Sequence, residues 1–181
     1  MAHPEFILLG DAVWLDLVNS ARGRTPHPLD LIPDAEAYSR WAKAQHLDAG
    51  VDPVPFDFVR RFREQLTALA KTLHDGLQPP TAAITAINEQ LARGTGSHRL
   101  TRVGGEWRLH FAPSRQPGAL EIIARSAAAT LADPRVFVRR CAGEHCSLFF
   151  TDDTPNQSRR WCSSQACGAN GRVERRRGLL R

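Results

Sequence analysis

The sequence predicts an α+β protein: a mostly helical N-terminal domain that contains a β-hairpin, followed by a small C-terminal module built around four cysteines. Before residue 132, apolar residues recur at helical spacing in several segments, and Gly- and Pro-rich loops separate these segments. On both sides of Gly104-Gly105 the pattern changes to alternation, which is typical of strands. All four cysteines lie between residues 141 and 167, beyond a shift in composition near residue 133. We therefore place the domains at residues 1–133 and 134–181.

The first elements follow from apolar periodicity and capping residues. We expect a short strand over residues 6–9 and a helix over residues 11–20, with Asp11 as its cap. Asp34 is a suitable N-cap for a helix that reaches residue 46 and carries Trp41 on its apolar side. The clearest amphipathic helix starts at Asp57 and ends at Gly76. A further helix is expected from Thr81 to about residue 93.

The later elements are a hairpin, a helix and two short strands. Two alternating runs, residues 97–103 and 106–111, meet at the two-residue turn Gly104-Gly105, which is a strong hairpin signal. A helix is expected over residues 117–131, and Asp133-Pro134 ends it. A strand over residues 136–138 leads into the first cysteine pair, and residues 148–150 form an apolar strand between the two pairs.

The cysteines form two pairs of the pattern Cys-x4-Cys, with fifteen residues between the pairs. Two such pairs on a chain that folds back supply four soft sulfur ligands, which is the ligand set of a closed, structural zinc site. We therefore predict one structural Zn²⁺ bound by Cys141, Cys146, Cys162 and Cys167. The alternatives are two disulfides or free thiols, and His145 is a potential substitute ligand. Disulfides rank low because no leader for secretion precedes the chain.

Charge is distributed unevenly along the chain. The net charge is +5 overall, but residues 135–181 hold ten arginines against four acidic residues, which gives +6 for this segment. Residues 1–134 hold fourteen basic and fifteen acidic residues, which gives −1. A basic end on a neutral body is typical of a nucleic-acid contact surface. The alternative is a solvated basic face, or one that pairs with the acids of the body.

The residues that we expect to contact nucleic acid flank and follow the second cysteine pair. Arginine side chains on an exposed face beside a rigid metal site can bind phosphates, and their planar guanidinium can also reach guanine edges. Trp161 fits the small core of the zinc module better than a base-stacking role. The candidate set is Arg159, Arg160, Asn170, Arg172, Arg175, Arg176 and Arg177.

Two polar residues interrupt the apolar run over residues 11–20. Asp16 and Asn19 either cap or hydrogen-bond the neighbouring loop, or line a small ligand pocket together with Trp14 and Trp41. A pocket of this kind would let the N-terminal domain sense a small-molecule effector.

We expect no enzymatic activity. The segment Gly94-Thr-Gly96 lacks the Lys and Ser/Thr of a phosphate loop, and the seven histidines are scattered singly. A Gly-x-Ser-x-Gly elbow is absent from the sequence. A zinc ion with four thiolate ligands has no position for water, so hydrolytic zinc chemistry is also not expected. The short apolar run at residues 6–9 is far too short to span a membrane, and we expect a cytoplasmic protein.

The C-terminal motif resembles a known family, the CGNR zinc finger. The resemblance is carried by residues 159–168, Arg-Arg-Trp-Cys-Ser-Ser-Gln-Ala-Cys-Gly, after Cys-x4-Cys and the segment Phe-Phe-Thr-Asp-Asp at residues 149–153. The family is named for a closing Cys-Gly-Asn-Arg. Here Ala169 follows Cys167-Gly168, so that the Asn and Arg are displaced to Asn170 and Arg172. The four ligands are unaffected by this departure.

The N-terminal part is similar to ABATE, the domain that accompanies this finger. The similarity lies in the box Leu-Asp-Leu-Val-Asn-Ser at residues 15–20 and in Leu-Asp-Leu-Ile at residues 29–32, which leads to the helix with Trp41. The resemblance implies a stress-induced transcription regulator, with a DNA-binding finger attached to a domain that senses a signal or forms a homodimer. The alternative is a zinc-stabilised protein-interaction module that does not bind nucleic acid.

Overall fold

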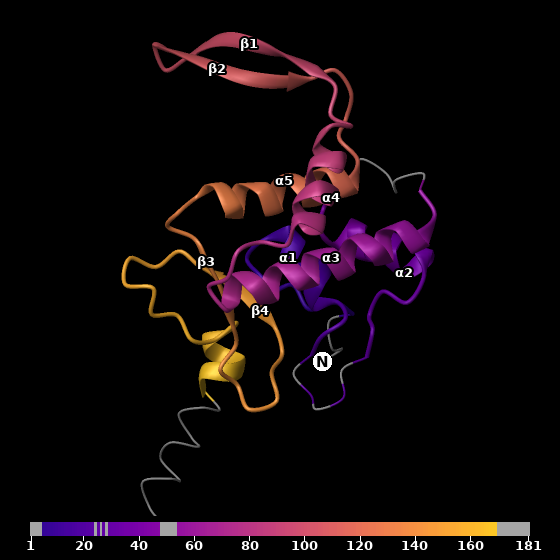
Figure 1. The fold of residues 1–181 in the computed structure, drawn as a ribbon. Helices are drawn as coiled ribbons and strands as arrows, with labels where there is room; N and C mark the ends of the chain where they lie inside the picture. Colours follow the sequence, from indigo (N-terminus) through magenta and orange to yellow (C-terminus); the bar gives the residue numbers. More distant parts are fainter. Residues whose placement is uncertain (1–4, 24, 26, 28, 48–53, 170–181) are drawn as a thin grey trace, which may run out of the picture.

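The computed structural model describes residues 5–23, 25, 27, 29–47 and 54–169. Within these ranges the chain forms a body of α-helices, one projecting hairpin and one short hairpin near the C-terminal end (Figure 1). The elements are α1 (Val13–Asn19), α2 (Ala35–Ala44), α3 (Phe56–His74), α4 (Thr81–Leu91), β1 (Gly96–Val103), β2 (Glu106–Pro113), α5 (Ala119–Ala132), β3 (Phe137–Arg140) and β4 (Phe149–Asp152). The predicted α+β fold class is confirmed.

The body is organised around the short helix α1, which is buried over almost its whole length. α1 packs against α3 and α5, and α4 packs against the same two helices from another side. The indole Nε1 of Trp14 donates a hydrogen bond to Thr130 Oγ1 on α5 over 3.0 Å, and Leu66 and Leu69 of α3 are fully buried. Among the described helices, none is both long and apolar enough to cross a membrane.

The capping signals at two helices are confirmed. The carboxylate of Asp34 accepts a hydrogen bond from the backbone N–H of Ala37 over 2.8 Å, so α2 begins where an N-cap was predicted. α3 ends at His74, and Gly76 follows with φ of 69°, a left-handed conformation that suits glycine best.

The prediction of a strand over residues 6–9 is wrong. This apolar segment does not pair as a strand; instead Ile7 and Leu9 pack against the buried cysteines. Asp11 does not cap α1 either, because the N-cap position is Ala12 and Asp11 has φ of 58°. The Asp11 carboxylate forms an ion pair with Arg159. Both differences arise because contacts with residues distant in sequence replace local pairing and capping.

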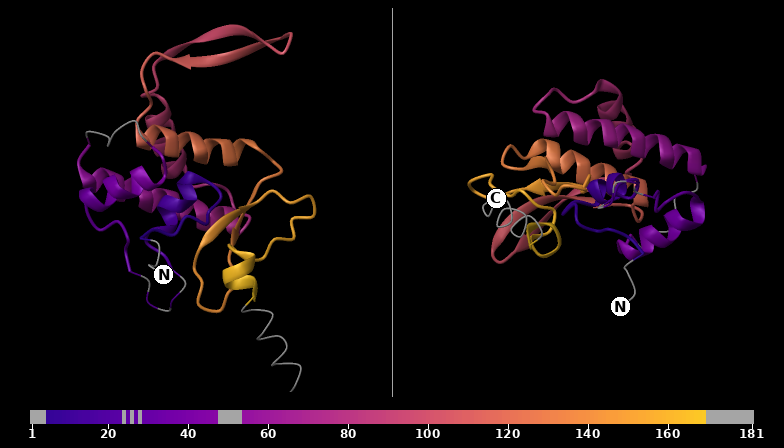
Figure 2. Two further views of the ribbon diagram at one scale, coloured as in Figure 1. Left: turned by 180° about the vertical axis from the view of Figure 1, so that it is seen from behind. Right: turned by 90° about the horizontal axis from the view of Figure 1, so that it is seen from below.

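The predicted hairpin of β1 and β2 is confirmed. Val103 pairs with Glu106, and the connecting residues Gly104 and Gly105 have φ of 60° and 91°, the positive values that a tight two-residue hairpin turn requires. The hairpin extends away from the helices (Figures 1 and 2), and nearly all of its residues are exposed.

The second hairpin, β3 and β4, joins the helical body to the cysteine module. All four residues of β4 are buried. Phe149 belongs to the large core of the helical body, together with Val138 of β3. The next residue, Phe150, faces the other way and belongs to a second core formed with the four cysteines and Leu148. Because alternate residues of a strand point to opposite faces, β4 forms a wall shared by both cores.

Asn19, the last residue of α1, holds β4 in place. Its side-chain Nδ2 donates to the Phe149 carbonyl over 2.8 Å, and its Oδ1 accepts from the Phe149 N–H over 2.9 Å. The amide thus bonds both backbone groups of one strand residue, as a neighbouring strand would. Asn19 is fully buried, so neither backbone group could turn to water if the amide were removed.

We expect Asn19→Ala to destabilise the whole protein by about 3 kcal/mol, because it leaves a buried N–H and a buried carbonyl without partners. Urea unfolding monitored by circular dichroism measures the change. Asn88→Ala, at an exposed position of α4, is the matched control and should change stability by less than about 0.5 kcal/mol. Equal stability of the two variants would contradict the role assigned to Asn19.

Candidate metal centre

The first cysteine pair lies on a tight turn between β3 and β4. Cys141 follows β3 directly, and its N–H donates to the Leu148 carbonyl over 2.9 Å. The chain then turns through Gly143, whose carbonyl accepts from the N–H of Cys146 over 3.0 Å. A Cβ added to Gly143 would lie 3.1 Å from the Cβ of Cys146, so a residue without a side chain suits this turn. The turn brings the two sulfurs of the first pair to one side.

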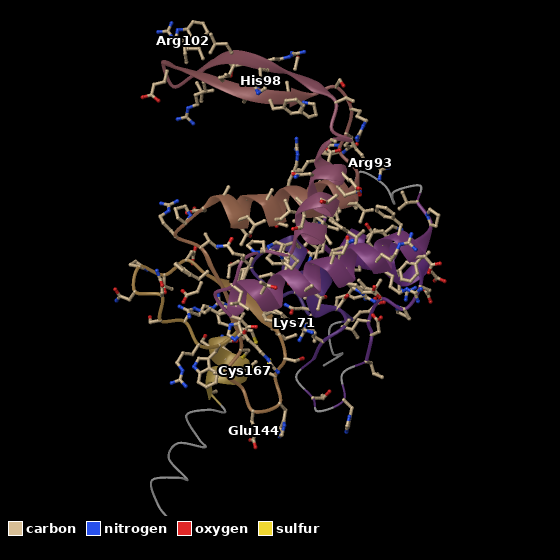
Figure 3. All side chains as sticks on the ribbon, in the orientation of Figure 1. Lys71, Arg93, His98, Arg102, Glu144 and Cys167 are labelled. Carbon is tan, nitrogen blue, oxygen red and sulfur yellow. The ribbon has the colours of Figure 1, made fainter. Side chains whose placement is uncertain are left out.

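The second cysteine pair frames a short helical turn over residues Ser164–Gly168: Cys162 precedes the turn, and Cys167 lies within it. Ser163 caps this turn: its Oγ accepts from the N–H of Ala166 over 3.2 Å, and its carbonyl accepts from the N–H of Cys167 over 3.0 Å. A backbone bond from Ala142 to the carbonyl of Arg160 connects the two cysteine-bearing segments. Figure 3 shows Cys167 on this turn, below β4.

The four sulfurs converge on one point. The Sγ atoms of all four cysteines lie within 4.8 Å of one another, with Cys146 to Cys162 at 3.8 Å and Cys162 to Cys167 at 3.7 Å. A tetrahedral zinc ion with Zn–S bonds of about 2.3 Å separates its sulfur ligands by about 3.8 Å. A disulfide requires about 2.05 Å, and none of the four cysteines forms one. The set therefore fits one structural Zn²⁺, as predicted, and His145 is exposed and outside the cluster.

The crowding of the sulfurs changes their ionisation. Hydrogen bonds from the thiols of Cys146 and Cys162 lower the pKa of Cys141 far below the ordinary thiol value, and the backbone N–H of Cys162 adds to this from 3.4 Å. The bond to Cys141 in turn raises the pKa of Cys146 to about 12. One thiolate in the cluster thus opposes the ionisation of its neighbours. A divalent cation removes this conflict, because it is attracted to all four thiolates at once.

An apolar shell surrounds the sulfurs. Leu148 and Phe150 are fully buried together with them, and the partly buried Ile7, Leu9 and Trp161 pack against this cluster. Of the two roles considered for Trp161, its place against this cluster agrees with the core role. The shell keeps water from the cysteines, which favours a structural ion.

Arg159 and Asp152 organise the loop between the pairs. The guanidinium of Arg159 lies 4.5 Å over the ring of Phe150 and donates to the carbonyls of Thr151, Trp161 and Cys162. Asp152 is fully buried and accepts bonds from Thr154 and from the N–H of Arg159. Burial alone would raise the pKa of Asp152, but these bonds outweigh it, and the pKa is lowered.

Sequence reasoning missed this structural role of Arg159 and Asp152. The Thr-Asp-Asp-Thr segment at residues 151–154 signals a turn, but nothing in it indicates that Arg159 closes back onto the turn.

The predicted nucleic-acid residues fall into three groups. Arg159 is half-buried and engaged as described above. Arg160 is exposed, lies 5.4 Å over the ring of Trp161, and makes no side-chain hydrogen bond within the part of the chain that the structure describes. Ser158, Arg159, Arg160, Trp161 and Ser164 together line an open cavity of about 390 Å³. The remaining candidates, Asn170, Arg172, Arg175, Arg176 and Arg177, lie outside the described residues.

The four residues of the predicted ligand pocket are all buried. Trp14 and Asn19 make the contacts given above. The carboxylate of Asp16 accepts from the N–H of Gly10 and from Gln45, each over 2.8 Å, and burial raises its pKa above the ordinary value. Trp41 stacks on Tyr38 with ring centroids 6.0 Å apart. These polar groups thus hold neighbouring segments together, and the ligand pocket stays a prediction.

Two family models match the chain in the order of its two parts. Residues 11–134 match ABATE, described as "Putative stress-induced transcription regulator", and residues 138–178 match the CGNR zinc finger. No curated protein matches the chain. The helical body and its four-sulfur site thus make up a zinc-finger protein of the regulator class. The chain belongs to the ABATE family and carries the CGNR zinc finger at its C-terminal end.

We expect the purified protein to contain one zinc ion per chain, because four sulfurs at tetrahedral spacing bind one ion. Elemental analysis measures the content. Cys162→Ala should abolish stoichiometric zinc, whereas Ser164→Ala, an exposed neighbour in sequence, should retain it. Full zinc in the Cys162→Ala variant, or oxidised thiols in the wild type, would contradict the assignment.

Zinc affinity should rise with pH. With the pKa of Cys146 raised to about 12, its thiol is protonated at neutral pH in the absence of metal, and zinc must displace the proton. Acidification therefore favours the protonated thiols and weakens binding, whereas a higher pH strengthens it. Calorimetry of zinc binding in two buffers with different ionisation enthalpies counts the released protons; a count of zero would contradict this description.

Proposed function

We propose that this protein is a transcription regulator that binds DNA through its C-terminal zinc finger. The observation that carries the proposal is the exposed side chain of Arg160, which lies over Trp161 at the edge of the zinc site and makes no side-chain hydrogen bond within the described residues. A guanidinium so placed can donate to phosphate oxygens without losing an existing bond. The family match supplies the regulator class, and residues 135–181 supply a net charge of +6.

The zinc ion orders this surface rather than contacting the nucleic acid. Arg159 bonds the carbonyls of Trp161 and Cys162, so the segment that carries Arg160 is fixed to the metal site from both sides. Ser158 and Ser164 line the same cavity and offer hydroxyl donors to a phosphate. A four-sulfur ion has no coordination position for water, so in this proposal the zinc has no catalytic role and the protein acts as a regulator rather than as an enzyme.

In this proposal the N-terminal domain regulates the finger, either by sensing a stress-related effector or by forming a homodimer. Asn19 and the shared core connect the domain to β4, so a change in the body can reach the finger through packed contacts. We place the protein in the cytoplasm, where thiols stay reduced and available to zinc.

A second candidate function is a zinc-stabilised module that binds another protein. The observation that favours it is an open groove of about 610 Å³, lined by the apolar segment Phe6–Leu9 and by Ser163, Gln165 and Ala166. Titration of zinc-loaded protein with random-sequence duplex DNA at low salt separates the two candidates. Absence of any binding would exclude the DNA-binding proposal and leave the protein-binding module.

DNA affinity should fall steeply with salt, because each neutralised phosphate contributes about 0.9 to the slope of log K against log salt. We expect Arg160→Ala to weaken binding and flatten the slope by about 0.9, and the pair Arg175→Ala and Arg176→Ala to flatten it by about 2. Fluorescence anisotropy at several salt concentrations measures both quantities.

The matched control for these variants is the pair Arg60→Ala and Arg61→Ala, exposed on α3. This pair removes the same charge as the Arg175 and Arg176 pair, but from the helical body. It should leave the slope unchanged. A slope that flattens equally in both pairs would show a general charge effect and would contradict the assignment to the finger.

A further inference from the structure

The projecting hairpin has one apolar and one polar face. Directly paired residues of an antiparallel hairpin share a face, so the register sorts the side chains. One face carries the pairs His98 with Phe111, Leu100 with Leu109, and Arg102 with Trp107; the other carries Arg99 with His110, Thr101 with Arg108, and Val103 with Glu106. We call the first set the apolar hairpin face.

The apolar hairpin face is largely open to solvent. The exposed fractions are 60% for Leu100, 65% for Trp107, 68% for Leu109 and 36% for Phe111. Within the part of the chain that the structure describes, the contact of this face with the body lies at the base of the hairpin, where the guanidinium of Arg125 on α5 lies 5.9 Å over the ring of Phe111. Figure 3 shows His98 and Arg102 on the hairpin, at the end of the molecule opposite Cys167.

This exposure is unfavourable in an isolated molecule. A two-stranded hairpin alone is only marginally stable in water, and its apolar face normally packs against a helix or another sheet. Four large side chains at these exposures leave on the order of 500 Å² of apolar surface in contact with water, as much as the largest patch on a typical monomer. The second hairpin, β3 and β4, is entirely different, because its strand β4 is buried on both faces.

We propose that the apolar hairpin face binds the same face of a second copy of this chain, so that the protein is a homodimer through its hairpins. The arrangement of side chains supports this occupant. Leu100 and Leu109 form the centre, and each end of the face places an aromatic residue on β2 and a basic residue on β1. A two-fold axis perpendicular to the strands brings the leucine pairs together and Trp107 onto the partner's Phe111. The bodies then lie at opposite ends.

The area of the apolar hairpin face agrees with the area that a stable dimer interface buries. A stable interface buries about 800 Å² on each partner. The apolar hairpin face supplies on the order of 500 Å² of this as an apolar centre, and the polar flanks of the hairpin supply the rim. Both outer edges of the two-stranded sheet are also unpaired within the described residues, so the hairpins can associate without displacing any existing strand.

The proposal rests on one part of the proposed function, the assignment of dimerisation to the N-terminal domain, but not on DNA binding. Failure of the dimer proposal can therefore be distinguished from failure of the DNA-binding proposal. A protein that dimerises but does not bind DNA would support the hairpin interface and contradict the DNA-binding proposal. A monomer that binds DNA would support the DNA-binding proposal and contradict the hairpin interface.

The test is sedimentation equilibrium of the zinc-loaded full chain without DNA. The wild type should have twice the chain mass of 20.1 kDa. The double variant Trp107→Ser and Leu109→Ser should raise the dimer Kd by about 100-fold or more, because each residue occurs twice in a two-fold interface. Leu100→Glu, on the other strand of the same face, should do the same.

The matched control is the double variant Arg108→Ser and His110→Ser. These two residues alternate with Trp107 and Leu109 along β2, so they belong to the polar face of the hairpin. This control variant should leave the dimer intact. Zinc content and thermal unfolding of every variant verify that the body is folded. A monomeric wild type at about 100 µM, an unchanged dimer in Trp107→Ser with Leu109→Ser, or equal dissociation of both double variants would overturn the proposal.

Discussion

The structure depends on one strand that belongs to two cores. β4 directs Phe149 into the helical body and Phe150 toward the four cysteines, and the amide of Asn19 bonds both backbone groups of Phe149. Zinc binding and the packing of the helices therefore stabilise the same four residues. The finger is joined to the body by a buried wall rather than by a linker, so the two parts should unfold cooperatively.

Arg159 shows how the metal site controls the surface around it. Its guanidinium carries a charge, yet its donors are directed at the carbonyls of Thr151, Trp161 and Cys162, and its ion pair with Asp11 ties the finger to the segment before α1. This engagement leaves Arg160 as the exposed cation of the pair. Two adjacent arginines thus have different roles, one in holding the site together and one in facing solvent, because one side chain folds back over Phe150 and the other lies over Trp161.

The two hairpins have opposite relations to the rest of the molecule. β3 and β4 are short, β4 is buried along its whole length, and helices and cysteines pack on either side of it. β1 and β2 are twice as long and stand away from the body, and their apolar face has no cover among the described residues other than Arg125. In our proposal a second copy of the chain covers this exposed face, whereas β4 is covered within the chain by the helical body and the cysteines.

The sequence by itself determined the elements whose signals are local. Asp34 as a cap, the Gly104-Gly105 turn and the Cys-x4-Cys spacing each act over a few residues, so α2, the projecting hairpin and the ligand set could be predicted. Only the tertiary structure decided that residues 6–9 cover the cysteines instead of forming a strand, that Asn19 pairs with β4, and that Arg159 closes the loop. These contacts join residues more than a hundred positions apart or depend on loop closure, and periodicity carries no information about them because it records which face is apolar but not what covers that face.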